Sequence, residues 1–203
     1  MSIGKPCTRT CRLFWRWALF GAAISFLPLG DARSADSLRL GEIELLGTGP
    51  SYLDLAAGVF DALGEGKDAR QTSAAGRIEL RLREKFLFIG PALGIIANTD
   101  GGVFGYAGFY ADIAYGRLVI TPLGAIGAYH RGDSKDLGGT LQFRVGIGLA
   151  YEFEDRSRLG LRVDHISNAH LHDRNPGEEE ILMSYSIPLH DLFAGSATNQ
   201  KGF

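Results

Sequence analysis

Three residues near the C-terminal end of the sequence could act together as a nucleophilic site: His165, Ser167 and Glu179. If residues 159–169 form a β-strand, His165 and Ser167 project from the same face, because side chains alternate along a strand. The following run, residues 181–189, alternates in the same way, and Glu179 lies just before it in phase with its apolar side chains. The residues in this phase are apolar at first and end at the site: Leu159, Leu161, Val163, His165, Ser167 and Ala169.

These residue types match the parts of an activated serine nucleophile. Histidine suits the base because its pKa lies near neutrality, and a serine hydroxyl needs such a base to attack. A carboxylate on the other ring nitrogen fixes the histidine tautomer and stabilises the imidazolium, a role that the phase gives to Glu179. Asn168 offers a backbone N–H or a side-chain amide to an oxyanion. On spacing alone the pattern is weak, because His-x-Ser also occurs where a strand simply ends.

Alternating apolar and polar residues predict the elements that must position this site. Segments of roughly ten residues recur along the chain, separated by turn signals such as Asn98-Thr99-Asp100-Gly101-Gly102. A short extended lead-in, residues 38–46, precedes them. The eight candidate strands are residues 51–63, 74–85, 86–98, 103–115, 118–130, 139–153, 159–169 and 181–189.

Eight antiparallel strands favour an all-β fold, and the segment 139–153 favours a transmembrane β-barrel. Its odd positions are apolar throughout and end in Tyr151 and Phe153, whereas its even positions hold Arg144 and Glu152 among small residues. A strand of about 9–11 residues crosses a bilayer, and an eight-stranded interior is narrow enough for side chains to fill. We expect Arg144, Arg162, Asp164 and Glu152 to pair inside, with glycines making room. A soluble barrel and a soluble β-sandwich remain the alternatives.

The N-terminus carries the features of a secretory signal peptide. Basic residues precede an apolar run, 17–29, which is too short for a spanning helix, and small residues follow at the cleavage positions. We expect a signal peptide over residues 1–35, cleaved near 32–35, and one outer-membrane barrel domain over 36–203. Both cysteines, Cys7 and Cys11, lie in the leader, so the mature chain has no disulfide. A formal net charge of −2 gives no indication of nucleic-acid binding.

Two short motifs resemble the lipid A 3-O-deacylase (PagL-type) family. They are His165-Ile166-Ser167-Asn168-Ala169 and Asn175-Pro176-Gly177-Glu178-Glu179. The family has an H-x-S-N-[AG] segment, an N-[PD]-G turn and an acidic residue two positions after the turn glycine. The chain departs from the family at His170, where glycine is more common, and the neighbouring Glu178 and Glu180 make the acid ambiguous by one position.

The resemblance implies an eight-stranded barrel of the bacterial outer membrane that removes the ester-linked 3-hydroxyacyl chain at position 3 of lipid A. Ser167 would be the nucleophile, His165 the base and Glu179 the acid, with Asn168 and Asn175 as weaker candidates for oxyanion support. The expected partners are lipid A or lipopolysaccharide and outer-membrane lipid. No metal or cofactor is needed, because water resolves the acyl-serine. A homodimer stays open.

Three rival hypotheses remain. The first is a non-catalytic outer-membrane barrel that serves structure or adhesion and shares the fold. The second is a soluble periplasmic ligand-binding barrel. The third is a metal site that gathers His165, His170, His172 and Asp173.

Overall fold

The computed structural model describes residues 37–64 and 72–189, all within one compact unit that spans Ala32–Phe203. The expected signal peptide (1–35) and the tail 191–203 lie outside the described residues. Among the described residues, no helix has the length and hydropathy needed to cross a membrane. The secondary structure consists of the strands β1 (Ser37–Leu40), β2 (Ile43–Leu46), β3 (Tyr52–Phe60), β4 (Ser73–Arg81), β5 (Ile89–Asn98), β6 (Val103–Ala111), β7 (Ile113–Tyr115), β8 (Leu118–His130), β9 (Leu141–Glu152), β10 (Arg158–Ser167) and β11 (Glu178–Pro188).

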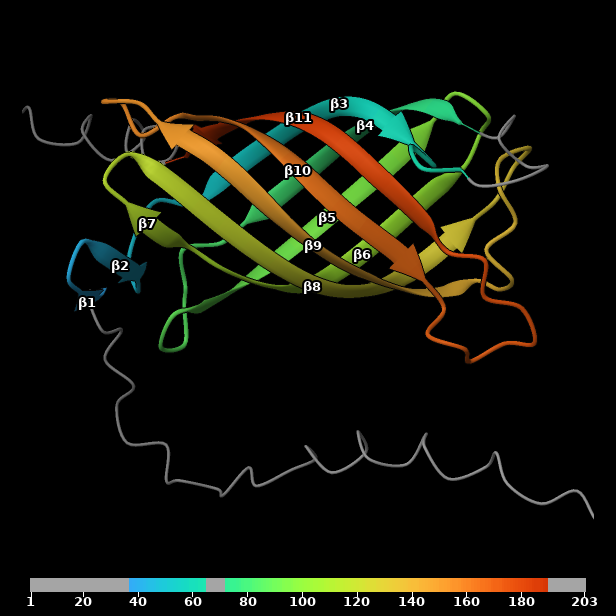
Figure 1. The fold of residues 1–203 in the computed structure, drawn as a ribbon, viewed down its shortest axis with the longest axis horizontal. Coiled ribbons are helices and arrows are strands. Elements are labelled where there is room, and N and C mark those ends of the chain that lie inside the picture. Colours follow the sequence, from blue (N-terminus) through green and yellow to red (C-terminus); the bar gives the residue numbers. More distant parts are fainter. Residues whose placement is uncertain (1–36, 65–71, 190–203) are drawn as a thin grey trace, which may run out of the picture. The chain divides into compact units, whose positions relative to one another are not determined.

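Eight of these strands close into an antiparallel barrel (Figure 1). The hydrogen-bonded order runs β8-β6-β5-β4-β3-β11-β10-β9, and β9 pairs back onto β8 to complete the ring. β7 continues β6 past Asp112, and the β1–β2 hairpin pairs with β7 outside the ring. A closed sheet leaves no unpaired strand edge within the ring, which a strand-built membrane protein requires.

The barrel is apolar outside and charged inside. The lumen-facing side chains of β4, for example, include Arg77, Glu79 and Arg81, all buried, while Ile78 between them is exposed. This distribution excludes an apolar-inside barrel and a sandwich with a conventional core, because such folds bury their large apolar side chains. Large exposed apolar side chains of the outer wall include Leu55, Ile78, Leu93, Ile95, Phe109, Val145, Ile147, Leu149, Leu161 and Met183.

Ion pairs fill the middle of the lumen. Asp164 accepts from Arg144 at 2.8 Å and from Arg162 at 3.1 Å, and all three side chains are buried. A Cβ on Gly146 would overlap the Asp164 carboxylate, so the glycine is needed for the pair to fit. The expected pairing inside the barrel is therefore confirmed for these residues. Glu152, at the end of β9, also forms an ion pair, but its partner is the buried Arg158, 2.8 Å away, rather than Arg144 or Arg162.

At the end of the lumen next to Ile166, apolar side chains form a buried cluster, which is called the plug below. It packs directly beneath the strand ends that carry His165 and Ser167, and Ile166, which separates these two residues, is fully buried in it. Burial of such a side chain contributes about 1.5–3 kcal/mol and holds this end of β10 in place from inside. The buried members of the plug are Phe60, Ala75, Ile96, Phe104, Tyr106, Tyr129, Leu137, Ile166 and Leu182.

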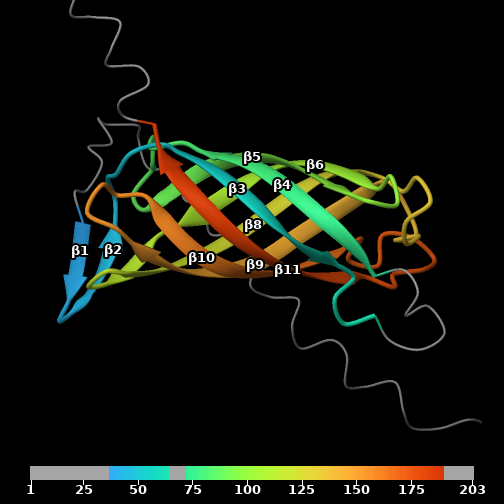
Figure 2. The same ribbon diagram turned by 90° about the horizontal axis from the view of Figure 1, so that it is seen from above.

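The two ends of the barrel differ in their connections. At one end, called the turn end below, the strands are joined by the short connections 82–88, 116–117 and 153–157. At the other, called the loop end, the connections include 131–140 and 168–177. Figure 1 shows the β1–β2 hairpin beside β7 at the turn end, and Figure 2 shows the hairpin at the same end of the barrel. β10 ends and β11 begins at the loop end, so His165, Ser167 and Glu179 lie there.

The eight predicted strands are confirmed, with corrections at their ends. The strand predicted over 159–169 ends at Ser167, because Ala169 has a φ of +52°. The strand predicted from 86 begins at Ile89, because Leu87 adopts a φ of +56° in a turn. The lead-in at 38–46 is a hairpin rather than one extended segment, because the chain reverses at Gly41, with a φ of +66°.

Candidate active site

Strand register places His165 directly opposite Glu179. The two residues are Cα partners in the β10–β11 ladder, so their side chains leave the sheet on the same face, side by side. His165 Nδ1 lies 3.2 Å from Glu179 Oε1. The side chains are 50% and 34% exposed, on the outer wall of the barrel rather than in the lumen. The base and the acid expected from the sequence are therefore in contact.

Alternation along β11 separates three consecutive glutamates. Glu178 and Glu180 are fully buried and face the lumen, where Glu180 lies 3.0 Å from Arg144. Glu179 alone of the three faces outward. Of the three glutamates, only Glu179 thus lies on the face that carries His165, which is the phase that the sequence pattern predicted.

Ser167 is the last residue of β10 and shares the outward face with His165 two residues earlier. Its neighbour across the ladder to β9 is Phe143. Among the described residues, Ser167 Oγ has no hydrogen-bond partner. The structure thus places the serine on the same face and at the same strand end as the His–Glu pair, without a hydrogen bond between Ser167 Oγ and His165.

Gly177 provides the space that the His165 ring occupies. A Cβ at Gly177 would lie 2.8 Å from His165 Cε1 and 3.3 Å from Nε2, and the residue has a φ of +62°. Both the backbone conformation and the close approach favour glycine. With Nδ1 held by Glu179 and the ring against Gly177, the histidine has a defined orientation. The sequence predicted Gly177 as a turn residue but not this contact.

A tight turn follows the nucleophile candidate. Leu171 N–H donates to the Asn168 carbonyl at 3.0 Å, and the two central residues, Ala169 and His170, have φ values of +52° and +61°. Positive φ at both central positions is the requirement of a type I′ turn, which normally takes glycine or asparagine. The departure from the family pattern at His170 therefore falls at a position where glycine is favoured physically.

Asn168 holds the loop instead of facing the outer wall. The side chain is fully buried, and its Nδ2 donates to the carbonyls of Leu137 at 2.8 Å and Arg174 at 2.6 Å. Its backbone N–H donates to Asn175 Oδ1 at 2.9 Å. The donors that we expected Asn168 to offer to an oxyanion are occupied in this structure. Asn175 lies against the same turn, with Nδ2 3.3 Å from His170 Nδ1.

The loop 131–140 supports the site from the neighbouring strand pair. Asp136 forms an ion pair with Arg174, and the Gly138 backbone N–H lowers the pKa of Asp136, which keeps the carboxylate charged. A Cβ on Gly138 would overlap the Arg174 carbonyl, and one on Gly139 would overlap the His172 ring. The sequence alone did not predict this packing, for which the adjacent glycines Gly138-Gly139 were the local signal.

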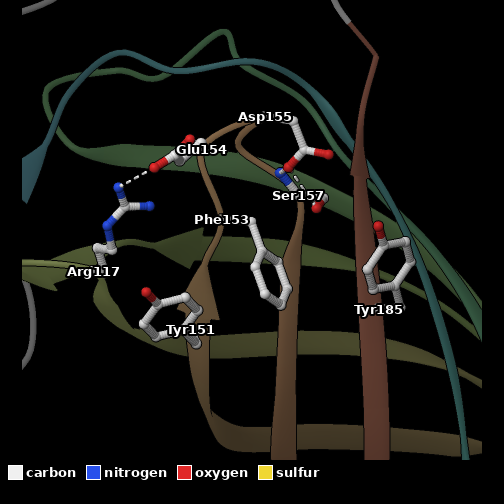
Figure 3. Close-up of a pocket in the computed structure, with 7 residues that line it drawn as sticks. All are labelled: Arg117, Tyr151, Phe153, Glu154, Asp155, Ser157 and Tyr185. Carbon is white, nitrogen blue, oxygen red and sulfur yellow. Dashed lines mark hydrogen bonds and ion pairs between the residues drawn. The ribbon is translucent and has the colours of Figure 1, made fainter.

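An open depression lies on the outer wall at the opposite end of the barrel. It has a volume of about 740 Å³ and lies at the turn end, where Tyr151, Phe153 and Tyr185 present their rings beside the Arg117–Glu154 ion pair (Figure 3). The length of β10 separates it from His165, so it plays no part in the site described above.

The metal hypothesis also lacks support: among residues 37–64 and 72–189, no group of three or more His, Cys, Asp or Glu side chains is placed to hold an ion.

A closed barrel with a charged lumen, an apolar outer wall and short turns at one end defines a class, the integral β-barrels of the bacterial outer membrane. A family model confirms the class and narrows it, because the lipid A 3-O-deacylase (PagL) model matches residues 57–188. The chain belongs to this family, and it is an outer-membrane β-barrel.

One curated relative and one solved structure are similar to the chain. Lipid A deacylase PagL of Bordetella bronchiseptica (strain ATCC BAA-588 / NCTC 13252 / RB50) is 36% identical over 52 residues, which cover 26% of this chain and 29% of that protein. The chain thus matches less than a third of this curated relative. The crystal structure of the outer membrane enzyme PagL superposes with a TM-score of 0.51 and 20% identity, over 68% of this chain and 99% of that one, which supports the fold.

Proposed function

We propose that this protein is a lipid A 3-O-deacylase that cleaves the ester-linked 3-hydroxyacyl chain at position 3 of lipid A through Ser167, His165 and Glu179. The observation that carries the proposal is the His165–Glu179 pair on the lipid-facing wall at the loop end. In outer-membrane barrels the long loops are extracellular, so the pair lies near the outer surface, where lipid A resides. Family membership supports the same substrate.

The chemistry follows from the orientation of the histidine. With Nδ1–H donating to Glu179, Nε2 keeps its lone pair and accepts the proton of Ser167 Oγ as this oxygen attacks the ester carbonyl. The tetrahedral intermediate collapses, and the sugar oxygen leaves with the proton from His165. A water molecule, deprotonated by His165, then attacks the acyl-serine, and Ser167 recovers its proton as the 3-hydroxy fatty acid departs.

The outer wall provides a path for the acyl chain. Val145 faces His165 across the β9–β10 ladder, and Phe143 faces Ser167. Both belong to the apolar row that continues down the wall towards Ile147. A chain cleaved at Ser167 would lie along this row within the bilayer, so substrate need not leave the membrane. Asn168 and Asn175 fit a positioning role for the loop that follows the nucleophile.

Mass spectrometry of lipid A from bacteria that express the chain tests the proposal. We expect loss of one 3-hydroxyacyl chain with the wild type, and no loss with Ser167→Ala or His165→Ala. Ser184→Ala, on the lumen face of β11, is the matched control and should retain activity. Full activity of both site variants would refute the site. Unmodified lipid A with a folded wild-type barrel would favour the structural or adhesive barrel.

A further inference from the structure

The β1–β2 hairpin extends the sheet beyond the barrel, outside the segment that the family model matches. β2 pairs with β7, with Ile43 opposite Tyr115 and Leu45 opposite Ile113. Figure 2 shows β1 and β2 at the turn end, next to the barrel wall. The hairpin contributes no residue to the ring or to the site at the loop end, so it requires a separate explanation.

One face of the hairpin is apolar and exposed. Leu38, Leu40 and Ile43 are 47%, 70% and 49% exposed. The opposite face carries an ion pair between Arg39 and Glu44, 3.0 Å apart. Large apolar side chains gathered on one face and charges on the other are typical of an element that lies at a membrane surface.

The apolar face continues the lipid-facing wall without a break. Cα partners that occupy one row of the sheet project on the same side, and successive ladders connect Ile43 to Tyr115, Tyr115 to Leu118 and Leu118 to Tyr151. A second row connects Leu45 through Ile113 and Ile120 to Leu149 by the same ladders. The hairpin thus presents Leu38, Leu40 and Leu45 on the side of the sheet that contacts lipid in the barrel.

Polar contacts fix the hairpin to the barrel in this orientation. Leu46 N–H donates to the Asp112 carbonyl at 2.9 Å, and Lys85 Nζ donates to the Leu46 carbonyl at 3.0 Å. Lys85 also binds the Asp112 carboxylate, at 3.2 Å. Because these bonds tie β2 both to the β6–β7 junction and to the connection 82–88, the apolar face cannot turn away from the side of the lipid.

Aromatic side chains mark the level of the membrane surface beside the hairpin. Tyr151, Phe153 and Tyr185 line the open depression in Figure 3 with the Arg117–Glu154 pair. Tyrosine rings close to charged side chains are typical of the headgroup level. Tyr115 and Tyr151 belong to the same sheet row as Ile43, so the row that enters the hairpin passes through this aromatic belt.

We propose that the β1–β2 hairpin is a membrane-interface element whose apolar face binds phospholipids of the periplasmic leaflet, at the boundary of headgroups and acyl chains. The occupant follows from continuity with the lipid-facing wall and from the short turns that identify this end as periplasmic. The hairpin would enlarge the membrane contact of the barrel on one side. The inference rests on the outer-membrane location and is independent of the catalytic proposal.

Tryptophan fluorescence in vesicles with brominated lipids tests the inference. Both tryptophans of the sequence, Trp15 and Trp17, lie outside the described residues, so Trp15→Phe and Trp17→Phe give a full chain without tryptophan. Into this background we would introduce Leu40→Trp or, as the matched control on the opposite face, Arg39→Trp. The proteins are refolded into phosphatidylcholine vesicles with or without bromine at carbons 6 and 7 of one acyl chain.

We expect blue-shifted emission from Leu40→Trp and quenching by brominated lipid about twofold or more stronger than for Arg39→Trp. Equal, water-like emission from both variants would overturn the inference. So would blue-shifted emission from Leu40→Trp without quenching, because it would place protein, such as a second copy of the chain, on this face. Lipid A deacylation should be unchanged by Leu40→Trp, so this test and that of Ser167 can fail separately.

Discussion

The lumen and the outer wall of this barrel both contain carboxylates paired with basic side chains, but the pairs differ in how exposed they are. Inside, Glu180 lies 3.0 Å from Arg144, and Arg144 also binds Asp164, with every one of these side chains buried. Outside, the neighbouring residue in the sequence, Glu179, holds His165 while both side chains stay partly exposed. Enclosed charges can pair only with one another, whereas a pair with an open side can meet a substrate. Access, more than residue type, distinguishes a candidate catalytic carboxylate from a structural one.

Removal of a lumen carboxylate should have the largest effect on stability. Asp164→Ala leaves Arg144 and Arg162 without their shared partner, and loss of one member of a buried ion pair costs about 3–5 kcal/mol. The midpoint of urea unfolding in vesicles measures the loss. Val163→Ala, on the outer face of the same strand, is the control, and an equal effect of both variants would contradict the structural role of the lumen network.

Neutralising adjacent glutamates should separate catalysis from structure. Glu179→Gln removes the negative charge that stabilises the His165 imidazolium, and we expect deacylation to fall by about 10²–10⁴-fold. Glu178→Gln faces the lumen and keeps an oxygen to accept from Asp61 N–H, so its rate should stay near the wild type. Initial rates on purified lipid A in detergent provide the comparison. Similar rates for the two variants would show that the outward-facing Glu179 matters no more to catalysis than the lumen-facing Glu178.

The contact of Gly177 with the His165 ring predicts a somewhat smaller effect. Gly177→Ala places a methyl group against Cε1, so the ring must move, and a displacement of about 1 Å can cost about 10²-fold in rate. Gly76→Ala is the control, because its Cβ would meet only a backbone oxygen 3.9 Å away. Retention of full activity by Gly177→Ala would show that deacylation does not depend on the position of the His165 ring against residue 177.

Relief of the strained turn should give the smallest change. His170→Gly removes a side chain from a left-handed conformation that costs about 1–2 kcal/mol in a residue other than glycine. After the added freedom of the unfolded chain, we expect a gain of about 1 kcal/mol in the free energy of unfolding. Leu171→Gly, outside the two left-handed positions, should give no gain. A stability unchanged by His170→Gly would mean that the turn carries no strain.

Alternation predicted most of this architecture because each residue of a barrel strand has only two environments. The period of two is visible in the sequence itself, and it alone distinguishes Glu179 from its neighbours and assigns Arg144 and Asp164 to the lumen. Contacts between distant segments are a different matter. The hydrogen bond from Asn168 to the Leu137 carbonyl depends on how two loops pack, and no local pattern in either loop encodes that geometry.

Loop conformation explains the remaining errors. The turn after Ser167 uses alanine and histidine where a type I′ turn favours glycine, so residue type gave no warning that the strand ends there. At 38–46 the sequence predicts one extended segment because its apolar residues lie near one another, and only Gly41 indicates that the chain reverses into a hairpin.

Covalent trapping of the nucleophile tests the central claim most directly. A p-nitrophenyl alkylphosphonate reacts with an activated serine, whose Oγ displaces p-nitrophenolate from phosphorus and yields a stable adduct. Peptide mass spectrometry of the treated barrel should locate the adduct on Ser167, with labelling lost in His165→Ala and deacylation lost in proportion to labelling. An adduct on any other residue that abolishes activity, with Ser167 unmodified, would contradict the account.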